Sequence, residues 1–165
     1  MRKNKYKIIV PTLNKKLWLR LVSDNFYVYP NSPKSLRLKA EAIAVNFRDE
    51  VLDELASSPY RASWQYEQND TVYLWTDVSS YSNFECTVIG ACGFYEKTYS
   101  DGFKEWMLGW IWLNPVVREK GLLREQWAEF KEKFGEFAVE APLSNSMRAF
   151  LKKNDPNIFI YNGKL

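Results

Sequence analysis

The chain has 165 residues, no histidine and a formal net charge of +3. Its composition, 46% apolar and 26% charged, is that of one ordinary folded domain and excludes disordered, collagen-like and coiled-coil chains. Because histidine is absent, Ser-His-Asp and Cys-His triads, His-ligated zinc and imidazole bases are excluded, so any catalysis must use carboxylates, Tyr, Ser, Lys or backbone groups.

The N-terminal region combines predicted helices with an excess of basic residues. The pattern predicts a strand over residues 6–10 that ends at Pro11, a helix from Asn14, and a long amphipathic helix over residues 35–56. Residues 1–39 contain ten Lys or Arg and one acidic residue, a charge of +9, which leaves −6 for the remainder. Two interpretations are open: a face that attracts phosphates or an acidic protein, or basic side chains spread around a solvated surface.

The middle of the chain has the pattern of an antiparallel meander. Strands are predicted over residues 61–67, 71–78, 86–95 and 105–114, with a polar turn over residues 98–102. Alternation of apolar residues and the turn residues between the runs indicate neighbouring strands joined by short connections.

Two cysteines, Cys86 and Cys92, lie six residues apart in one of these strands. We interpret them as small core residues rather than a disulfide or redox pair, because residues of one strand that share a face are too far apart to bond. No run approaches the length of a membrane span, and the first ten residues lack the apolar core of a signal peptide. A reducing, cytoplasmic setting is therefore expected.

The C-terminal region has a different periodicity. A helix over residues 123–134 is followed by a strand over residues 136–141, a helix over residues 145–153 and a last strand over residues 158–161. We therefore predict an α/β (α+β) fold in a single domain that spans residues 1–165.

An apolar strand runs directly into the sequence Arg118-Glu119-Lys120-Gly121 and then into the helix over residues 123–134. The N–H groups of a first helical turn and the helix dipole attract anions, and Gly121 allows a phosphate to approach the backbone closely. Arg118, Lys120 and Arg124 would add positive charge. The alternative is a plain strand-to-helix connection with solvated charges.

The segment Arg118-Glu-Lys-Gly121-Leu-Leu123 resembles the hallmark of the GNAT superfamily of N-acetyltransferases, Gln/Arg-x-x-Gly-x-Gly/Ala, with Leu123 in place of the last small residue. A glycine-bearing strand over residues 88–94 precedes it, and the helix over residues 145–153 is similar to the family's Asn-x-x-Ala segment. The end of the chain, residues 157–161, is similar to the ends of cohesin acetyltransferases. The resemblance covers residues 86–161.

The resemblance implies a mixed, mostly antiparallel central sheet flanked by helices, and direct transfer of acetyl from acetyl-CoA to an amine without a metal. It implies that backbone groups near the end of the fourth strand bind the pantetheine arm and that one N–H stabilises the oxyanion; these are Trp112, Leu113 and Asn114. It implies that the N–H groups of the following loop, which begins at Arg118, hold the pyrophosphate; these are Glu119, Lys120, Gly121, Leu122 and Leu123. Asn145 would contact the arm from the other side.

Some family members place a glutamate as general base near the start of the fourth strand, where this chain has Met107. Glu105 lies two residues earlier on the same strand face and is the first candidate base, although it also suits a solvated carboxylate in a hairpin. Glu140 is the second candidate. The family's acid is a Tyr where this chain has Lys152, so the proton donor would be Ser144, Ser146 or a water molecule.

The acceptor amine is expected on a protein, a small molecule or a nucleic-acid-linked substrate, and the basic segment favours an acidic or nucleic-acid-associated one. The chain is expected to be a monomer or homodimer without membrane contact. Two other functions are open: a GNAT-fold binding module that has lost transfer, and a nucleic-acid-binding domain that uses the basic N-terminus. In the latter, bases would stack on Trp64, Tyr66, Tyr73 and Trp75, although core packing explains these rings equally well.

Overall fold

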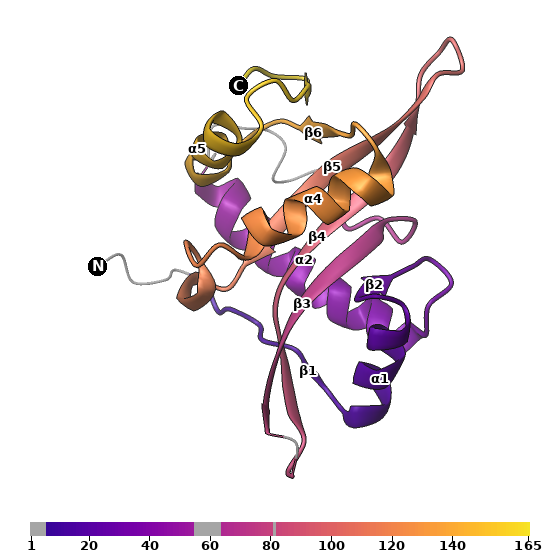
Figure 1. Cartoon of the computed structure of the whole chain (residues 1–165), viewed down its shortest axis with the longest axis vertical. Helices are drawn as coiled ribbons and strands as arrows, with labels where there is room; N and C mark the ends of the chain where they lie inside the picture. The colour runs from indigo at the N-terminus through magenta and orange to yellow at the C-terminus, as the bar shows by residue number, and fades with distance from the viewer. Residues whose placement is uncertain (1–5, 55–63, 81) are drawn as a thin grey trace.

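The computed structural model describes residues 6–54, 64–80 and 82–165, and within these residues seven strands form one sheet (Figure 1). The strand order is β2-β3-β4-β5-β6-β7, and β1 pairs with β4. The central strands β3 (Thr71–Ser80), β4 (Glu85–Thr98) and β5 (Lys104–Leu113) are antiparallel. Strands β6 (Ala138–Glu140) and β7 (Ile160–Tyr161) continue the sheet in parallel. The predicted mixed, mostly antiparallel sheet is therefore confirmed.

Helices cover both faces of this sheet (Figure 1). On one face, α1 (Lys15–Ser23) and α2 (Lys34–Glu54) pack against the sheet in what we call the first core, which includes Ile43, Val88 and Trp112. On the other face, α4 (Leu122–Phe134) and α5 (Asn145–Asn154) form the second core, where Phe130 meets Phe94. The apolar stripe predicted for the helix over residues 123–134 supplies this second core.

A β-bulge interrupts β5 at Gly109. Gly93 pairs with Trp110 and Phe94 pairs with Leu108, so Gly109 has no partner across the ladder. Because one extra residue reverses the alternation of side chains, Leu108 faces the second core whereas Trp110 faces the first. Beyond the bulge, β4 and β5 extend into the long hairpin that projects from the body of the molecule in Figure 1.

The two cysteines are free and buried, as core residues were predicted to be. The expectation that they share one face of the strand is wrong, because Cys86 belongs to the first core and Cys92 to the second. The register shifts near Ile89, where Val88 pairs with Thr76 and the next pair joins Gly90 to Trp75. This bulge reverses the side-chain alternation between the two cysteines.

The predicted strand over residues 6–10 is wrong. The strand β1 (Thr12–Leu13) begins only after Pro11, and the backbone of Ile9 is bonded instead to a side chain of α2. The Asn46 amide accepts from the Ile9 N–H at 2.9 Å and donates to its carbonyl at 2.6 Å. A buried side-chain amide thus supplies the partners that a neighbouring strand would supply. The short strand β2 (Tyr27–Val28), paired with β3, was not predicted.

The predicted strand over residues 61–67 is wrong where the structure describes it, since residues 64–67 form no strand, and residues 61–63 lie outside the described residues. Trp64 and Tyr66 instead pack their rings around Trp110, with centroids 6.5 and 6.3 Å away. Tyr73 and Trp75 are buried in the second core. All four rings that were considered for base stacking are therefore packed against other aromatic side chains.

The other predicted elements are present with shifted ends. The long helix starts at Lys34 and is described to Glu54, so its predicted last two residues lie outside the described part. The strands at residues 136–141 and 158–161 are shorter than predicted, as the bounds of β6 and β7 given above show. In the described ranges no helix has both the length and the apolar composition to cross a membrane.

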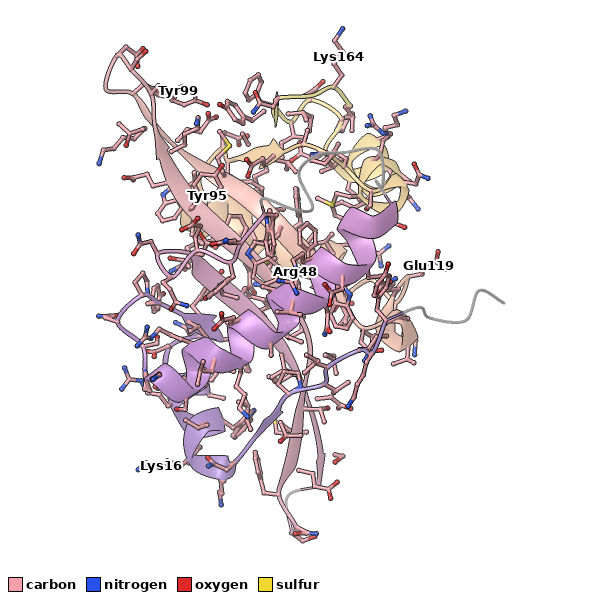
Figure 2. The ribbon with its side chains drawn as sticks, turned by 180° about the vertical axis from the view of Figure 1, so that it is seen from behind. Lys16, Arg48, Tyr95, Tyr99, Glu119 and Lys164 are labelled. Atoms are coloured by element: carbon pink, nitrogen blue, oxygen red, sulfur yellow. The ribbon has the colours of Figure 1, made fainter. Side chains whose placement is uncertain are left out.

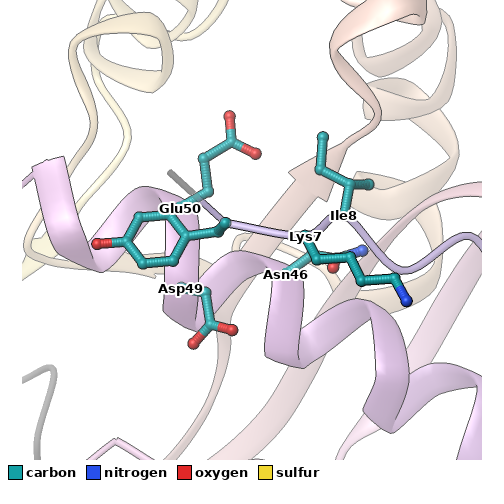
Figure 3. A pocket seen from close by; sticks show the side chains of 6 residues that line it. Lys7, Ile8, Asn46, Asp49 and Glu50 are labelled. Atoms are coloured by element: carbon teal, nitrogen blue, oxygen red, sulfur yellow. The ribbon is translucent and has the colours of Figure 1, made fainter. Parts of the chain in front are cut away.

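Among the basic residues of the N-terminal stretch that the structure describes, Lys7 precedes β1, and the others lie on α1 and on the first turns of α2; these are Lys15, Lys16, Arg20, Lys34, Arg37 and Lys39. In Figure 2, Lys16 lies at one end of the molecule, and Glu119, which belongs to the predicted phosphate loop, lies well away from it. Lys16 therefore lies apart from the loop, whereas Lys7 lines a pocket together with Glu50, whose carboxylate pairs with Arg118 (Figure 3).

Candidate active site

Strands β5 and β6 separate and leave a pocket between them. They pair only at Met107 with Ala138 and at Leu108 with Val139; beyond these pairs, β5 continues along β4 while β6 ends at Glu140. The pocket is mostly apolar; it is lined by Phe47, Leu108, Gly109, Trp110, Ile111, Val139, Glu140, Pro142, Leu143, Ser144 and Met147. Among these described residues, Glu140 alone carries an ionisable side chain.

The Glu140 carboxylate is held in a defined position at this pocket. Its Oε2 atom accepts a hydrogen bond from the Tyr95 hydroxyl at 3.0 Å. Burial raises the pKa of Glu140, whereas the hydrogen bond from Tyr95 and the charge of Lys97 act to lower it. A Cβ atom at Gly109 would lie 3.1 Å from the Tyr95 ring and 3.5 Å from Glu140 Oε2, so the bulged glycine makes room for the pair.

A second carboxyl, Asp70, lies behind the wall of the pocket. It is 5% exposed; its Oδ2 accepts from the Trp110 indole N–H at 3.3 Å, and its buried Oδ1 has no hydrogen-bond partner among the described residues. Burial raises the pKa of Asp70 to about 7, the Trp110 bond opposes this, and the charges of Glu67 and Glu140 add to it. Sequence reasoning missed Asp70, because an aspartate after Gln68 and Asn69 has the pattern of an ordinary turn.

Glu105, the first candidate base, lies away from the pocket. It is near the end of the β4–β5 hairpin, where its Oε2 accepts from the Tyr99 hydroxyl at 2.8 Å. Met107, which occupies the position of the family's glutamate, is fully buried. The structure therefore brings Glu140 to the pocket and leaves Glu105 on the hairpin.

Ser144 reaches the pocket from the start of α5. Its hydroxyl oxygen accepts from the Met147 N–H at 3.1 Å and so caps the helix, which leaves the hydroxyl hydrogen available as a donor. Asn145 is the first residue of this helix, as predicted, and it is exposed.

The loop between β5 and α4 has two residues in the left-handed region. After a turn of 3-10 helix over Pro115–Val117, the backbone has φ +62° at Glu119 and φ +85° at Gly121. Gly121 occupies the cap position of α4 and has no side chain that could accept a hydrogen bond. The first N–H groups of the helix are therefore not capped by this residue. Lys120 is exposed, and the half-buried Leu122 and Leu123 pack against the second core.

Some groups that were expected to bind a ligand already have partners within the chain. The Asn114 N–H donates to the Ile89 carbonyl at 2.8 Å, and the Leu113 carbonyl accepts from Arg118 Nε at 2.8 Å. The other end of the Arg118 guanidinium pairs with Glu50 of α2 at 2.7 Å. Arg118 is therefore engaged with the body of the protein rather than free in the loop.

No group of three or more His, Cys, Asp or Glu side chains is placed to hold a metal ion within the described residues. The candidate site comprises the apolar pocket, the Tyr95–Glu140 pair, the Ser144 hydroxyl and the uncapped start of α4.

No family model matches this chain, and no curated protein matches it. Among solved structures, the xEco2 acetyltransferase domain is similar at 16% identity and a TM-score of 0.53, over 84% of this chain and 90% of that one. The same domain bound to a CoA conjugate has 14% identity and a TM-score of 0.48, over 84% and 91%. A ribosomal-protein-alanine N-acetyltransferase from Brucella melitensis biovar Abortus 2308 has 13% identity and a TM-score of 0.43, over 77% and 87%. At these identities the first likeness establishes a shared fold.

Proposed function

Because the chain has the fold of the GNAT superfamily, we propose that it is an acetyl-CoA-dependent N-acetyltransferase that moves an acetyl group to an amine by direct attack. The observation that carries the proposal is the pocket where β5 and β6 separate, with the half-buried carboxylate of Glu140 at its wall. A thioester and an amine that meet in this pocket would be enclosed by apolar side chains and would have one base beside them.

The loop before α4 is suited to the diphosphate of acetyl-CoA. The N–H groups from Glu119 to Leu123 would bind the phosphate oxygens, and Lys120 and Arg124 would add charge. The remaining free backbone groups of residues 112–114 would bind the pantetheine arm, with Asn145 on its other side. The left-handed Gly121 supports this assignment, because it turns the backbone into α4 without a side chain over the N–H groups.

Glu140 would act as the general base. Its raised pKa makes it a stronger base than an ordinary glutamate, and the bond from Tyr95 to one oxygen leaves the other free to take a proton from the incoming ammonium. The amine nitrogen then bonds to the thioester carbonyl carbon while the carbon–sulfur bond breaks. The nitrogen then loses its second proton and the departing sulfur gains one, and the Ser144 hydroxyl, at the pocket wall, is the candidate relay that gives its proton to the sulfur and takes the proton from the nitrogen.

A GNAT-fold binding module without transfer activity is the second candidate. The observation that favours it is Met107, a fully buried apolar residue where the family has its glutamate. The exposed Lys152, where the family has its tyrosine, points the same way.

The deciding experiment combines calorimetric titration with acetyl-CoA and a thiol-release assay on a panel of amines: a lysine peptide, spermidine, an aminoacyl compound and a nucleobase. Binding together with thiol release on at least one amine is expected. Binding without release on any amine would support the binding module. Absence of both heat and a thermal shift at millimolar acetyl-CoA would overturn the transferase and the module alike; a salt-sensitive gel shift would then support nucleic-acid binding.

A further inference from the structure

One carboxylate of α2 connects the end of β5 to the start of the phosphate loop. Glu50 Oε2 accepts from the Trp112 indole N–H at 2.8 Å, and Glu50 Oε1 pairs with the Arg118 guanidinium at 2.7 Å. Arg118 also lies over the Trp112 ring, with its guanidinium carbon 5.8 Å from the ring centroid. All three side chains thus form one closed network.

This network lies where the backbone changes direction. Arg118 Nε donates to the Leu113 carbonyl at 2.8 Å, so the guanidinium links the last residue of β5 to the residue that opens the loop. The next residue, Glu119, has a left-handed backbone, a conformation that persists in non-glycine residues only when the surroundings hold it. The Glu50 side chain is 20% exposed and that of Arg118 is 37% exposed, so water screens the pair only in part.

We propose that Glu50 is a positioning residue that holds residues 118–121 in the conformation that binds the diphosphate of acetyl-CoA, and that Arg118 is a structural link rather than a phosphate ligand. This inference rests on the proposed function. It follows that phosphate contacts come from the N–H groups at the start of α4, with Lys120 and Arg124. Substitution of Glu50 should then raise the KM only for acetyl donors that carry the diphosphate.

The test compares two acetyl donors, acetyl-CoA and S-acetylpantetheine, the second of which has no diphosphate. In Glu50→Gln, the KM for acetyl-CoA is expected to rise about tenfold, the scale of one lost charge-assisted bond, while kcat stays within about twofold. The kinetic constants for S-acetylpantetheine should not change. Binding of 3′-phosphoadenosine 5′-diphosphate, the part of acetyl-CoA that carries the diphosphate, should weaken by the same factor as the KM for acetyl-CoA when measured by calorimetry.

Asp49 provides the matched control. It neighbours Glu50 on α2, but its carboxylate points the opposite way in Figure 3 and pairs with Arg48 at 3.1 Å. Asp49→Asn should therefore leave the KM for both donors unchanged. Arg118→Met should reproduce the effect of Glu50→Gln, and the double variant should be no worse than either single variant, because both changes break the same link.

Equal losses for both donors in Glu50→Gln and Arg118→Met would overturn the inference, since a general folding defect affects both. A wild-type KM for acetyl-CoA in both variants would also overturn it. If the wild-type chain binds neither acetyl-CoA nor 3′-phosphoadenosine 5′-diphosphate, the proposed function fails and hydrogen exchange without ligand becomes the test. Faster amide exchange over residues 114–121 in Glu50→Gln than in the wild type supports the link, and equal exchange overturns it.

Discussion

The sheet carries two tyrosine–glutamate pairs that differ mainly in where they lie. Tyr95 donates to Glu140 at 3.0 Å, and Tyr99 donates to Glu105 at 2.8 Å. Tyr95 lies on β4, and Tyr99 directly follows the last residue of that strand, four positions later, so the period of two places both on the same face. In Figure 2, Tyr95 lies over the body of the sheet, whereas Tyr99 lies toward the end of the projecting hairpin.

The surroundings, rather than the hydrogen bond, separate the two carboxylates in function. Glu140 lines a mostly apolar pocket, its charge acts on the buried carboxyl of Asp70, and its own pKa is raised by burial. Glu105 has no place in the lining of that pocket. If this comparison is correct, substitutions at the first pair should impair transfer and the same substitutions at the second pair should not.

The largest expected effect is that of Glu140→Gln. Glutamine retains an acceptor for the Tyr95 hydroxyl but cannot take a proton, so kcat/KM should fall about 10²–10³-fold, the scale of a lost general base. Acetyl-CoA affinity, measured by calorimetry, should stay within about twofold. Retention of more than a tenth of wild-type kcat/KM would show that another group is the base.

The pH profile adds a second measurement on the same variant. A base works only when it is unprotonated, so activity should fall as pH falls through the pKa of Glu140, which burial raises above the ordinary value of about 4.3. This acidic limb should be absent in Glu140→Gln. A limb that persists unchanged in the variant would assign it to a different group.

Tyr95→Phe is expected to have an intermediate effect. The ring and its packing stay, but Glu140 loses the hydrogen bond that orients it and lowers its pKa, so kcat/KM should fall about tenfold. The acidic limb of the profile should move to higher pH, because the pKa of Glu140 rises. Tyr99→Phe is the matched control and should change neither quantity. Similar effects of the two substitutions would remove the distinction between the pairs.

Asp70 lies near the first pair only. Its substitution is expected to have a smaller effect, and that effect is on the free energy of unfolding. Its pKa of about 7 means that the folded chain keeps a proton that the unfolded chain releases at lower pH. The stability that Asp70 contributes is therefore complete below the unfolded pKa and is lost as pH rises through about 7. Asparagine cannot ionise, so the free energy of unfolding of Asp70→Asn relative to wild type should increase by about 1–2 kcal/mol between about pH 5 and about pH 8.

Urea denaturation at the two pH values measures this difference. The charges of Glu67 and Glu140 also face Asp70 and raise its pKa, so Glu140→Gln should reduce the pH dependence of wild-type stability. An unchanged difference between Asp70→Asn and wild type at the two pH values would show that Asp70 is charged throughout.

Local periodicity was sufficient to predict the elements whose residues pack along one face. The helix of Trp127, Phe130 and Phe134 and the strand from residue 105 were predicted from spacing alone, and both are present. Prediction failed where a distant side chain replaced a strand partner, as Asn46 does for Ile9. The strand prediction for residues 64–67 was wrong for a similar reason, because the aromatic rings of this segment pack on Trp110 while its backbone does not join the sheet.

The site was less predictable than the fold because its defining contacts join residues far apart in sequence. Tyr95 and Glu140 are 45 residues apart, and the bulge at Gly109 that makes room for them shows in sequence only as a glycine in a strand. A glutamate at an expected strand position, such as Glu105, carries no sign of whether a pocket lies beside it. Asp70 is identified only by its burial and by an oxygen without a partner.

The smallest expected effect is that of Glu105→Gln, and it tests the comparison most directly. The substitution removes a carboxylate of the same type, bonded to the same type of donor, on the same strand that leads into the pocket. Glutamine can accept the Tyr99 hydrogen bond, so kcat/KM should stay within about twofold and the acidic limb should not move. A loss as large as that of Glu140→Gln would mean that the hairpin moves over the pocket during turnover and brings Glu105 to the acceptor. The two carboxylates would then share one function, and their positions in this structure would represent only one state of the enzyme.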